Sequence, residues 1–155
     1  PHQSLLLPLR LYPHPALSCF HWLALGFTAP SVYVPFFACI TDTPAAYPRG
    51  KVTYSPDSAY WVFKQAGVMV DAHYKAFGDQ LADVQKELRQ AFGRSVIETD
   101  RVAKNLAGSE LRTYLTQHSL QNAELALMKY RELTADLITK ATAFSPLSYR
   151  QDLNL

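Results

Sequence analysis

The chain has 155 residues, a length that suits one domain with one hydrophobic core. Its formal net charge is only +2 and its basic residues form no cluster, which excludes the electrostatic pattern of a nucleic-acid-binding protein. The five histidines have no metal-binding spacing, and no GxSxG element, phosphate-binding glycine loop or dinucleotide fingerprint is present, so we expect no metal and no cofactor.

Composition divides the chain near residue 54. Nine of the ten prolines lie at or before Pro56, whereas nearly all of the charged residues follow residue 54. We therefore expect a charge-poor strand segment at 1–54, a helical segment at 55–145 and a tail at 146–155, together forming one domain or part of one. The charged residues of the first segment are Arg10, Asp42, Arg49 and Lys51.

Two apolar segments of the first half have the length of β-strands. Residues 18–27 read SCFHWLALGF and residues 31–40 read SVYVPFFACI, and both are bounded by proline-containing segments. Their near-continuous apolarity predicts burial on both faces. Pro35 has no backbone N–H to donate, so it predicts an edge position or a bulge.

A membrane span is the alternative interpretation of residues 11–40, which carry no charge. Prolines interrupt this region, and its longest proline-free run, 16–29, is shorter than the roughly 20 residues that a spanning helix needs. We therefore favour strands and expect no membrane association.

Helix signals begin after residue 54. Ser55 is a suitable cap and Pro56 suits a first helical position, so we expect a helix to begin at residue 56. Apolar residues then recur on one face past Gly78 as far as Leu88, which predicts a helix that Gly78 kinks without ending. The residues that define the first part of this face are Tyr60, Phe63, Gly67, Val70 and Tyr74.

Two further helix starts follow. SVIE at 95–98 has the spacing of a capping box and predicts a shorter helix that ends near Leu106. Gly108 and Ser109 then open a long last helix, which Ser145 and Pro146 end. Its expected apolar stripe consists of Leu120, Ala123, Leu127, Tyr130, Thr134, Leu137, Ala141 and Phe144.

Residues with catalytic chemistry are sparse. Cys19 and Cys39 lie in apolar surroundings without a CxxC spacing, which favours buried thiols. His21 lies beside a tryptophan in an apolar segment and His118 lies within the last helix, so we interpret both as packing residues rather than bases.

Several segments, in this order and spacing, resemble the C-terminal third of the dipeptidase A (PepD) family, to which the secernins are related. The resemblance covers residues 21–142, and its most specific parts are SVYVPF and the SPDSAYWVF helix start about twenty residues later. The segments are HWLALG at 21–26, SVYVPFFA at 31–38, YSPDSAYWVF at 54–63 and the end of the last helix, LALMKYRELTADLITK.

The resemblance implies an α+β fold, the C-terminal part of an αββα sandwich of the N-terminal-nucleophile hydrolases. Such an enzyme attacks a peptide bond with an N-terminal cysteine whose own α-amino group acts as the base. Both cysteines here are internal, so we expect the nucleophile to be missing and assign no catalytic residue. Tyr33 and Tyr60 are candidates to line a dipeptide pocket, with core packing as the alternative, and Arg10 is a candidate to hold the substrate carboxylate.

Two functional classes remain. The first is the C-terminal portion of a cysteine dipeptidase, whose partner is a missing N-terminal catalytic segment and whose substrate, when complete, is a dipeptide. The second is a non-catalytic helical assembly or binding module that forms a homo-oligomer through its last helix. In either class we expect the strand segment to leave apolar surface uncovered without a partner.

Overall fold

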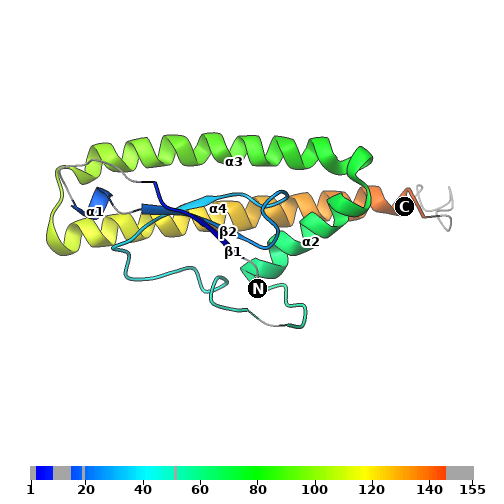
Figure 1. Ribbon diagram of the computed structural model, residues 1–155, viewed down its shortest axis with the longest axis horizontal. Helices are drawn as coiled ribbons and strands as arrows, with labels where there is room; N and C mark the ends of the chain where they lie inside the picture. The colour runs from blue at the N-terminus through cyan, green and yellow to red at the C-terminus, as the bar shows by residue number, and fades with distance from the viewer. Residues whose placement is uncertain (1–2, 9–14, 19, 51, 146–155) are drawn as a thin grey trace, which may run out of the picture.

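The computed structural model describes residues 3–8, 15–18, 20–50 and 52–145, which form an α+β fold (Figure 1). Short strands occupy the first part of the chain and long helices the second, which confirms the expected fold class. None of the described helices combines the length and the apolarity that crossing a membrane requires.

The two apolar segments form neighbouring strands of a small antiparallel sheet, in the order β1-β2-β3. Pro35 lies in β3 at one edge of the sheet, opposite Trp22 of β2, which confirms the edge position that its missing N–H predicts. A single helical turn, α1, precedes β2. The bounds are β1 Gln3–Leu6, α1 Pro15–Ser18, β2 Phe20–Leu25 and β3 Val34–Phe37.

All four residues of β3 are buried, which confirms the expected burial on both faces of this strand. In β2 the expectation is only partly met, because three of its six residues are half-buried. Val34 and Phe36 belong to the large hydrophobic core, which also contains residues of all three long helices. Phe37 belongs to a second cluster with residues near the end of α3 and the beginning of α4. The Phe37 backbone N–H donates a hydrogen bond to Ser119 Oγ on α4 (3.3 Å), so β3 is held between helices.

The first long helix, α2, spans Ala59–Ala72, so the predicted start at residue 56 is wrong. The Ser58 N–H donates to the Ser55 carbonyl (3.1 Å), which closes a tight turn with Pro56 at its second position. The fixed φ of proline suits that position as well as it suits the first turn of a helix. Ser58 is the extended residue before the helix, and its side chain makes no capping hydrogen bond.

The second long helix, α3, spans Tyr74–Ala103, and the chain breaks at His73 rather than bending at Gly78. His73 has φ −135° and ψ 46°, and its ring packs on Phe77 and Phe144. Gly78 lies inside α3. The continuous helix expected from residue 56 to Leu88 is therefore two helices that meet at an elbow.

Residues 95–98 do not begin a new helix, because α3 continues through them to Ala103. Phe92 lies before the expected helix start at residue 95, and Val96 and Thr99 lie after it. All three side chains are buried on the same face of α3. Packing of this face stabilises an uninterrupted helix, so residues 95–98 do not act as a capping box.

The last helix, α4, spans Gly108–Thr142, which confirms its predicted start. It lies between α2 and α3 and packs against both (Figure 1). Leu120 and Ala141 are half-buried, and Phe144 lies just beyond the helix with its ring stacked on His73. The other residues of the expected stripe are buried: Ala123, Leu127, Tyr130, Thr134 and Leu137.

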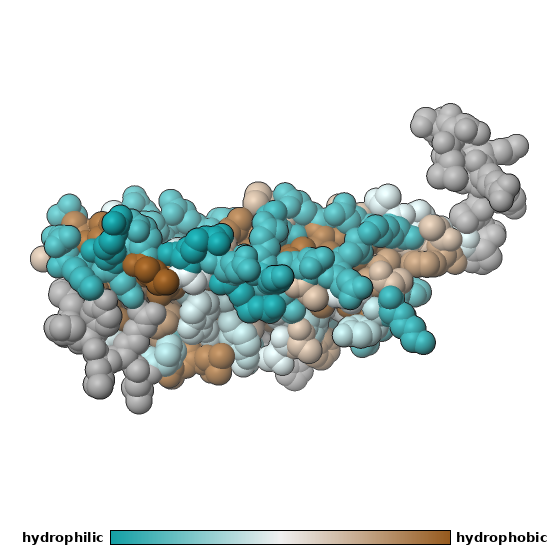
Figure 2. Space-filling model, turned by 90° about the horizontal axis from the view of Figure 1, so that it is seen from above, coloured by the Kyte–Doolittle hydropathy of each residue, from teal (hydrophilic) through white to brown (hydrophobic). Residues whose placement is uncertain are grey.

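Exposed apolar side chains occur both at β1 and on the helices. Figure 2 looks onto α3 and shows a mostly hydrophilic face with hydrophobic side chains in separate spots. By contrast, Leu5, Leu6 and Leu7 are consecutive and at least half exposed. Three exposed leucines thus lie at the edge of the sheet opposite to β3.

Two helical glycines should respond to alanine in opposite directions. A Cβ at Gly67 would lie 2.7 Å from Pro30 Cγ, whereas a Cβ at Gly93 would meet no atom within 4 Å. We expect Gly67→Ala to lower the free energy of unfolding by about 1–2 kcal/mol through overpacking, and Gly93→Ala to raise it by about 0.5–1 kcal/mol through helix propensity. Urea denaturation of both variants measures this; equal effects would contradict the packing of Gly67 on Pro30.

Candidate functional site

The residues expected to bind substrate lie in different parts of the fold. Tyr33, half-buried before β3, shares a 2.9 Å hydrogen bond between its hydroxyl and Ser4 Oγ of β1. Tyr60 lies on α2, where its ring packs edge-on against Trp61 and the Lys64 ammonium lies 5.2 Å from its centroid. Neither tyrosine lines any of the three cavities described below. Arg10 lies outside the described residues.

The histidines expected to pack do contact aromatic rings. His21 of β2 stacks on Phe36 of β3, and partial burial lowers the pKa of its imidazole. The His118 ring lies 4.3 Å from that of Tyr114; burial lowers its pKa, and the negative charge of Glu98 opposes this shift.

The cysteines and the acidic residues are the other side chains with potential catalytic or metal-binding chemistry. Cys39 is half-buried and packs against the cluster that contains Phe37, and Cys19 lies outside the described residues. No three His, Cys, Asp or Glu side chains within the described ranges are placed to hold a metal ion. The described residues also form three hollows that can act as binding surfaces.

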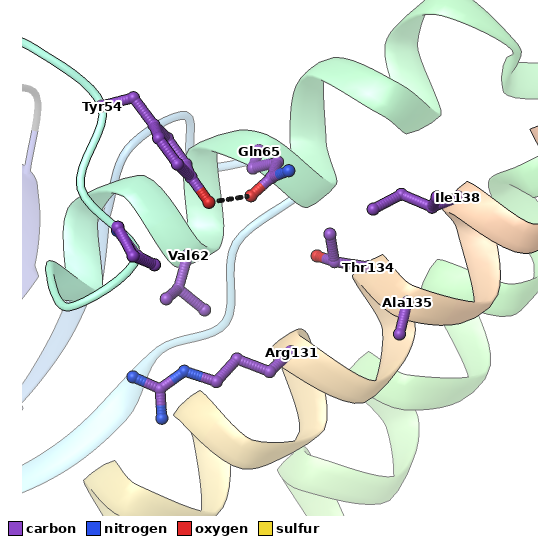
Figure 3. A pocket seen from close by; sticks show the side chains of 8 residues that line it. Tyr54, Val62, Gln65, Arg131, Thr134, Ala135 and Ile138 are labelled. Carbon is purple, nitrogen blue, oxygen red and sulfur yellow. Dashed lines mark hydrogen bonds between the residues drawn. The ribbon is translucent and has the colours of Figure 1, made fainter.

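The first of these surfaces is a cleft of about 260 Å³ between α2 and α4, shown in Figure 3. Its apolar walls include Val62 and Ile138, and the Tyr54 hydroxyl donates to Gln65 Oε1 (3.3 Å) across one side. The Arg131 side chain extends from α4 along the opposite side. A guanidinium beside apolar walls is suited to a carboxylate that carries an apolar group.

The second surface is a cavity of about 470 Å³ at the α2–α3 elbow, which we call the elbow cavity. One wall is the loop at 29–31, whose carbonyl groups are held by side chains of the helices. Gln85 Nε2 donates to the carbonyl oxygens of Ala29 and Ser31 (2.8 Å each), and the Tyr130 hydroxyl donates to the carbonyl of Pro30 (2.7 Å). Burial raises the pKa of Tyr130, so this phenol stays protonated and can donate.

The third surface is a hollow of about 430 Å³ where α3 ends and α4 begins. Its lining mixes apolar Val102 and Leu106 with Glu110 and Tyr114. This mixture does not define a ligand.

Sequence reasoning missed Arg131 and the residues of the elbow cavity. Arg131 is an exposed charge in the middle of a long helix, and the elbow exists only because the chain breaks at His73. Neither feature has a motif, so nothing in the local sequence distinguishes these positions from other solvated positions.

The strand segment and the helix that follows it match a known peptidase family. The model of Peptidase family C69 matches residues 1–87, more than half of the chain. The chain therefore belongs to Peptidase family C69.

Relatives in lactic acid bacteria are similar over most of this chain. A probable dipeptidase of Latilactobacillus sakei is 32% identical over 138 residues, which are 86% of this chain and 28% of the relative. A probable dipeptidase B of Lactococcus lactis subsp. lactis (strain IL1403) is 30% identical over 149 residues, 96% of this chain and 31% of the relative. Dipeptidase A of Lactobacillus helveticus is 26% identical over 129 residues, 83% of this chain and 27% of the relative. The chain thus spans about three tenths of the length of these relatives.

Two tyrosine hydroxyls give a matched pair of variants: Tyr130 supports the wall of the elbow cavity, and Tyr54 lines the cleft between α2 and α4. Tyr130→Phe leaves the partly buried Pro30 carbonyl without its donor, so we expect it to lower the free energy of unfolding by about 0.5–1.5 kcal/mol. Tyr54→Phe removes an exposed hydrogen bond and should change that free energy by less than about 0.5 kcal/mol. Thermal and urea unfolding test both; equal losses would show that the loop does not depend on Tyr130.

Proposed function

We propose that this chain is the C-terminal portion of a cysteine dipeptidase whose N-terminal cysteine lies in another part of the polypeptide. The observation that carries the proposal is the family match together with relatives, named as dipeptidases, that are about three times as long. The position of Cys39 supports it. The backbone nitrogen of this internal cysteine is part of a peptide bond, so it cannot act as the base that an N-terminal nucleophile uses.

In the complete enzyme, the terminal amine takes the proton of the cysteine thiol as sulfur attacks the substrate carbonyl. The peptide C–N bond then breaks, the leaving amine takes the proton, and water hydrolyses the thioester. The chain described here contributes to this chemistry through structure. Its strands and helices form one folding unit, because the large core contains Val34 and Phe36 together with Phe63 and Leu127.

The edge of β1 is where the remainder of the enzyme attaches in this proposal. No described strand pairs with the outer edge of β1, so its backbone can accept another strand. Exposed Leu5, Leu6 and Leu7 provide apolar contacts at the same edge. The occupant that we propose is a strand from the part of the longer enzyme that this chain lacks.

Tyr33 remains a candidate substrate residue in the assembled enzyme. Its hydroxyl lies beside Ser4 of β1, and therefore near the edge that the additional strand would cover. Tyr60 and Arg10 are proposed with it, the first as an aromatic wall and the second as a carboxylate partner.

The alternative of a module that self-associates through its last helix finds less support. The stripe of α4 is already buried against α2 and α3 within one chain, so it is not free to pair with a second copy. Any association of the isolated chain would use β1 instead.

We predict that the purified 155-residue chain hydrolyses no dipeptide, because it lacks the terminal cysteine. A panel of dipeptides assayed with this chain, and with its Cys19→Ala and Cys39→Ala variants, tests this. The positive control is the same chain within a longer enzyme that contains the upstream segment. Thiol-dependent hydrolysis that either substitution abolishes would make an internal cysteine the nucleophile and overturn the proposal.

We also predict that the isolated chain associates through β1. Leu6→Lys places a charge at this edge and should shift the sedimentation profile towards monomer across a dilution series. Ile97→Lys is the matched control, because Ile97 is 72% exposed and lies on α3 rather than on β1. A wild-type chain that stays monomeric at every concentration would contradict the docking role of β1.

A further inference from the structure

We propose that the elbow cavity is a binding site for a small molecule in which a compact apolar group stands next to a positive charge, as in an arylalkyl amine. The proposal rests on the cavity's own geometry. It does not depend on the proposed dipeptidase function.

The walls of the cavity are set before any ligand arrives. Gln85 and Tyr130 hold three consecutive carbonyl groups of the loop at 29–31. The Pro30 ring packs so closely on α2 that only a glycine fits at position 67. A preformed wall costs little conformational entropy on binding, and about 470 Å³ lies within the usual size range of small-molecule pockets.

The rim of the cavity exposes large apolar side chains. Phe27, Val68 and Tyr74 are 53%, 51% and 71% exposed, and all three line the same hollow. The Tyr74 ring lies over Gly78, 3.3 Å from where a Cβ would stand, so glycine makes room for it. Apolar side chains grouped around a hollow are typical of a binding site, because a ligand that covers them releases their hydration water.

One charge gives the cavity its selectivity. Among the described residues that line it, Asp71 is the only one with a formal charge. A carboxylate beside apolar walls attracts a cation and repels an anion of the same shape. The faces of Phe27 and Tyr74 add to this preference, because aromatic rings attract cations.

The test uses two probes of similar shape and opposite charge. We expect phenethylamine to bind the folded 155-residue chain saturably, with one site per chain by titration calorimetry, and 3-phenylpropionate to bind at least tenfold more weakly. Asp71→Asn should weaken phenethylamine binding by roughly fivefold, the upper range for an exposed ion pair. Asp83→Asn is the matched control, since Asp83 is an exposed carboxylate of α3 outside the lining, and it should leave binding unchanged.

A second variant separates the apolar contribution from the charge. Tyr74→Ala removes an exposed ring of the rim and should weaken both probes, and circular dichroism of each variant verifies that the helices persist. Absence of phenethylamine binding to the folded chain at millimolar concentration would overturn the proposal. Equal affinity of the wild-type chain for phenethylamine and 3-phenylpropionate would also overturn it. So would an Asp71→Asn variant that binds phenethylamine as tightly as the wild-type chain does. Peptidase activity is not measured, so these outcomes leave the dipeptidase proposal unaffected.

Discussion

Tyr130 connects the parts of this fold that lie farthest apart in the sequence. Its ring packs edge-on against Phe63 of α2 at a centroid distance of 4.7 Å, and its hydroxyl donates to Pro30, one hundred residues earlier. The Tyr130 side chain is buried and its hydrogen bond to Pro30 is partly buried, so the bond is partly shielded from water. It holds the loop before β3 against both α2 and α4. The position of β3, the wall of the elbow cavity and the contact of Pro30 with Gly67 all depend on it.

Tertiary packing explains which local signals succeeded. The two apolar segments were predictable as strands because near-continuous apolarity requires burial, and β3 is buried completely. The capping signals at Ser55 and at residues 95–98 failed because each cap contributes only about 1 kcal/mol. Burial of one large side chain contributes about 1.5–3 kcal/mol, so Phe92 and Val96 together outweigh a cap between them.

The candidate sites were less predictable than the fold. The family could be recognised from SVYVPF and SPDSAYWVF, because those segments carry an order and a spacing as well as a composition. The elbow cavity could not be predicted in this way, since it depends on the dihedral angles of His73, where α2 and α3 meet. Asp71 could not be singled out either, because it resembles any other solvated carboxylate on a helix. Tyr33 and Tyr60 were chosen for their amphipathic rings, and that property does not specify which hollow a ring lines.

The sheet is asymmetric, because its two edges end in different ways. At one edge, β3 lacks an N–H at Pro35 but gains a hydrogen bond from its Phe37 N–H to α4, so helices replace the missing strand. At the other edge, every residue of β1 has a backbone N–H, and exposed Leu5 and Leu6 of the strand are followed by exposed Leu7. Each 100 Å² of apolar surface left in water there forgoes about 2.5 kcal/mol of stabilisation. Helices cover one edge and leave the other apolar and extended, which is the asymmetry that our proposal uses: the sheet of the longer enzyme would continue in a single direction, from β1 outwards.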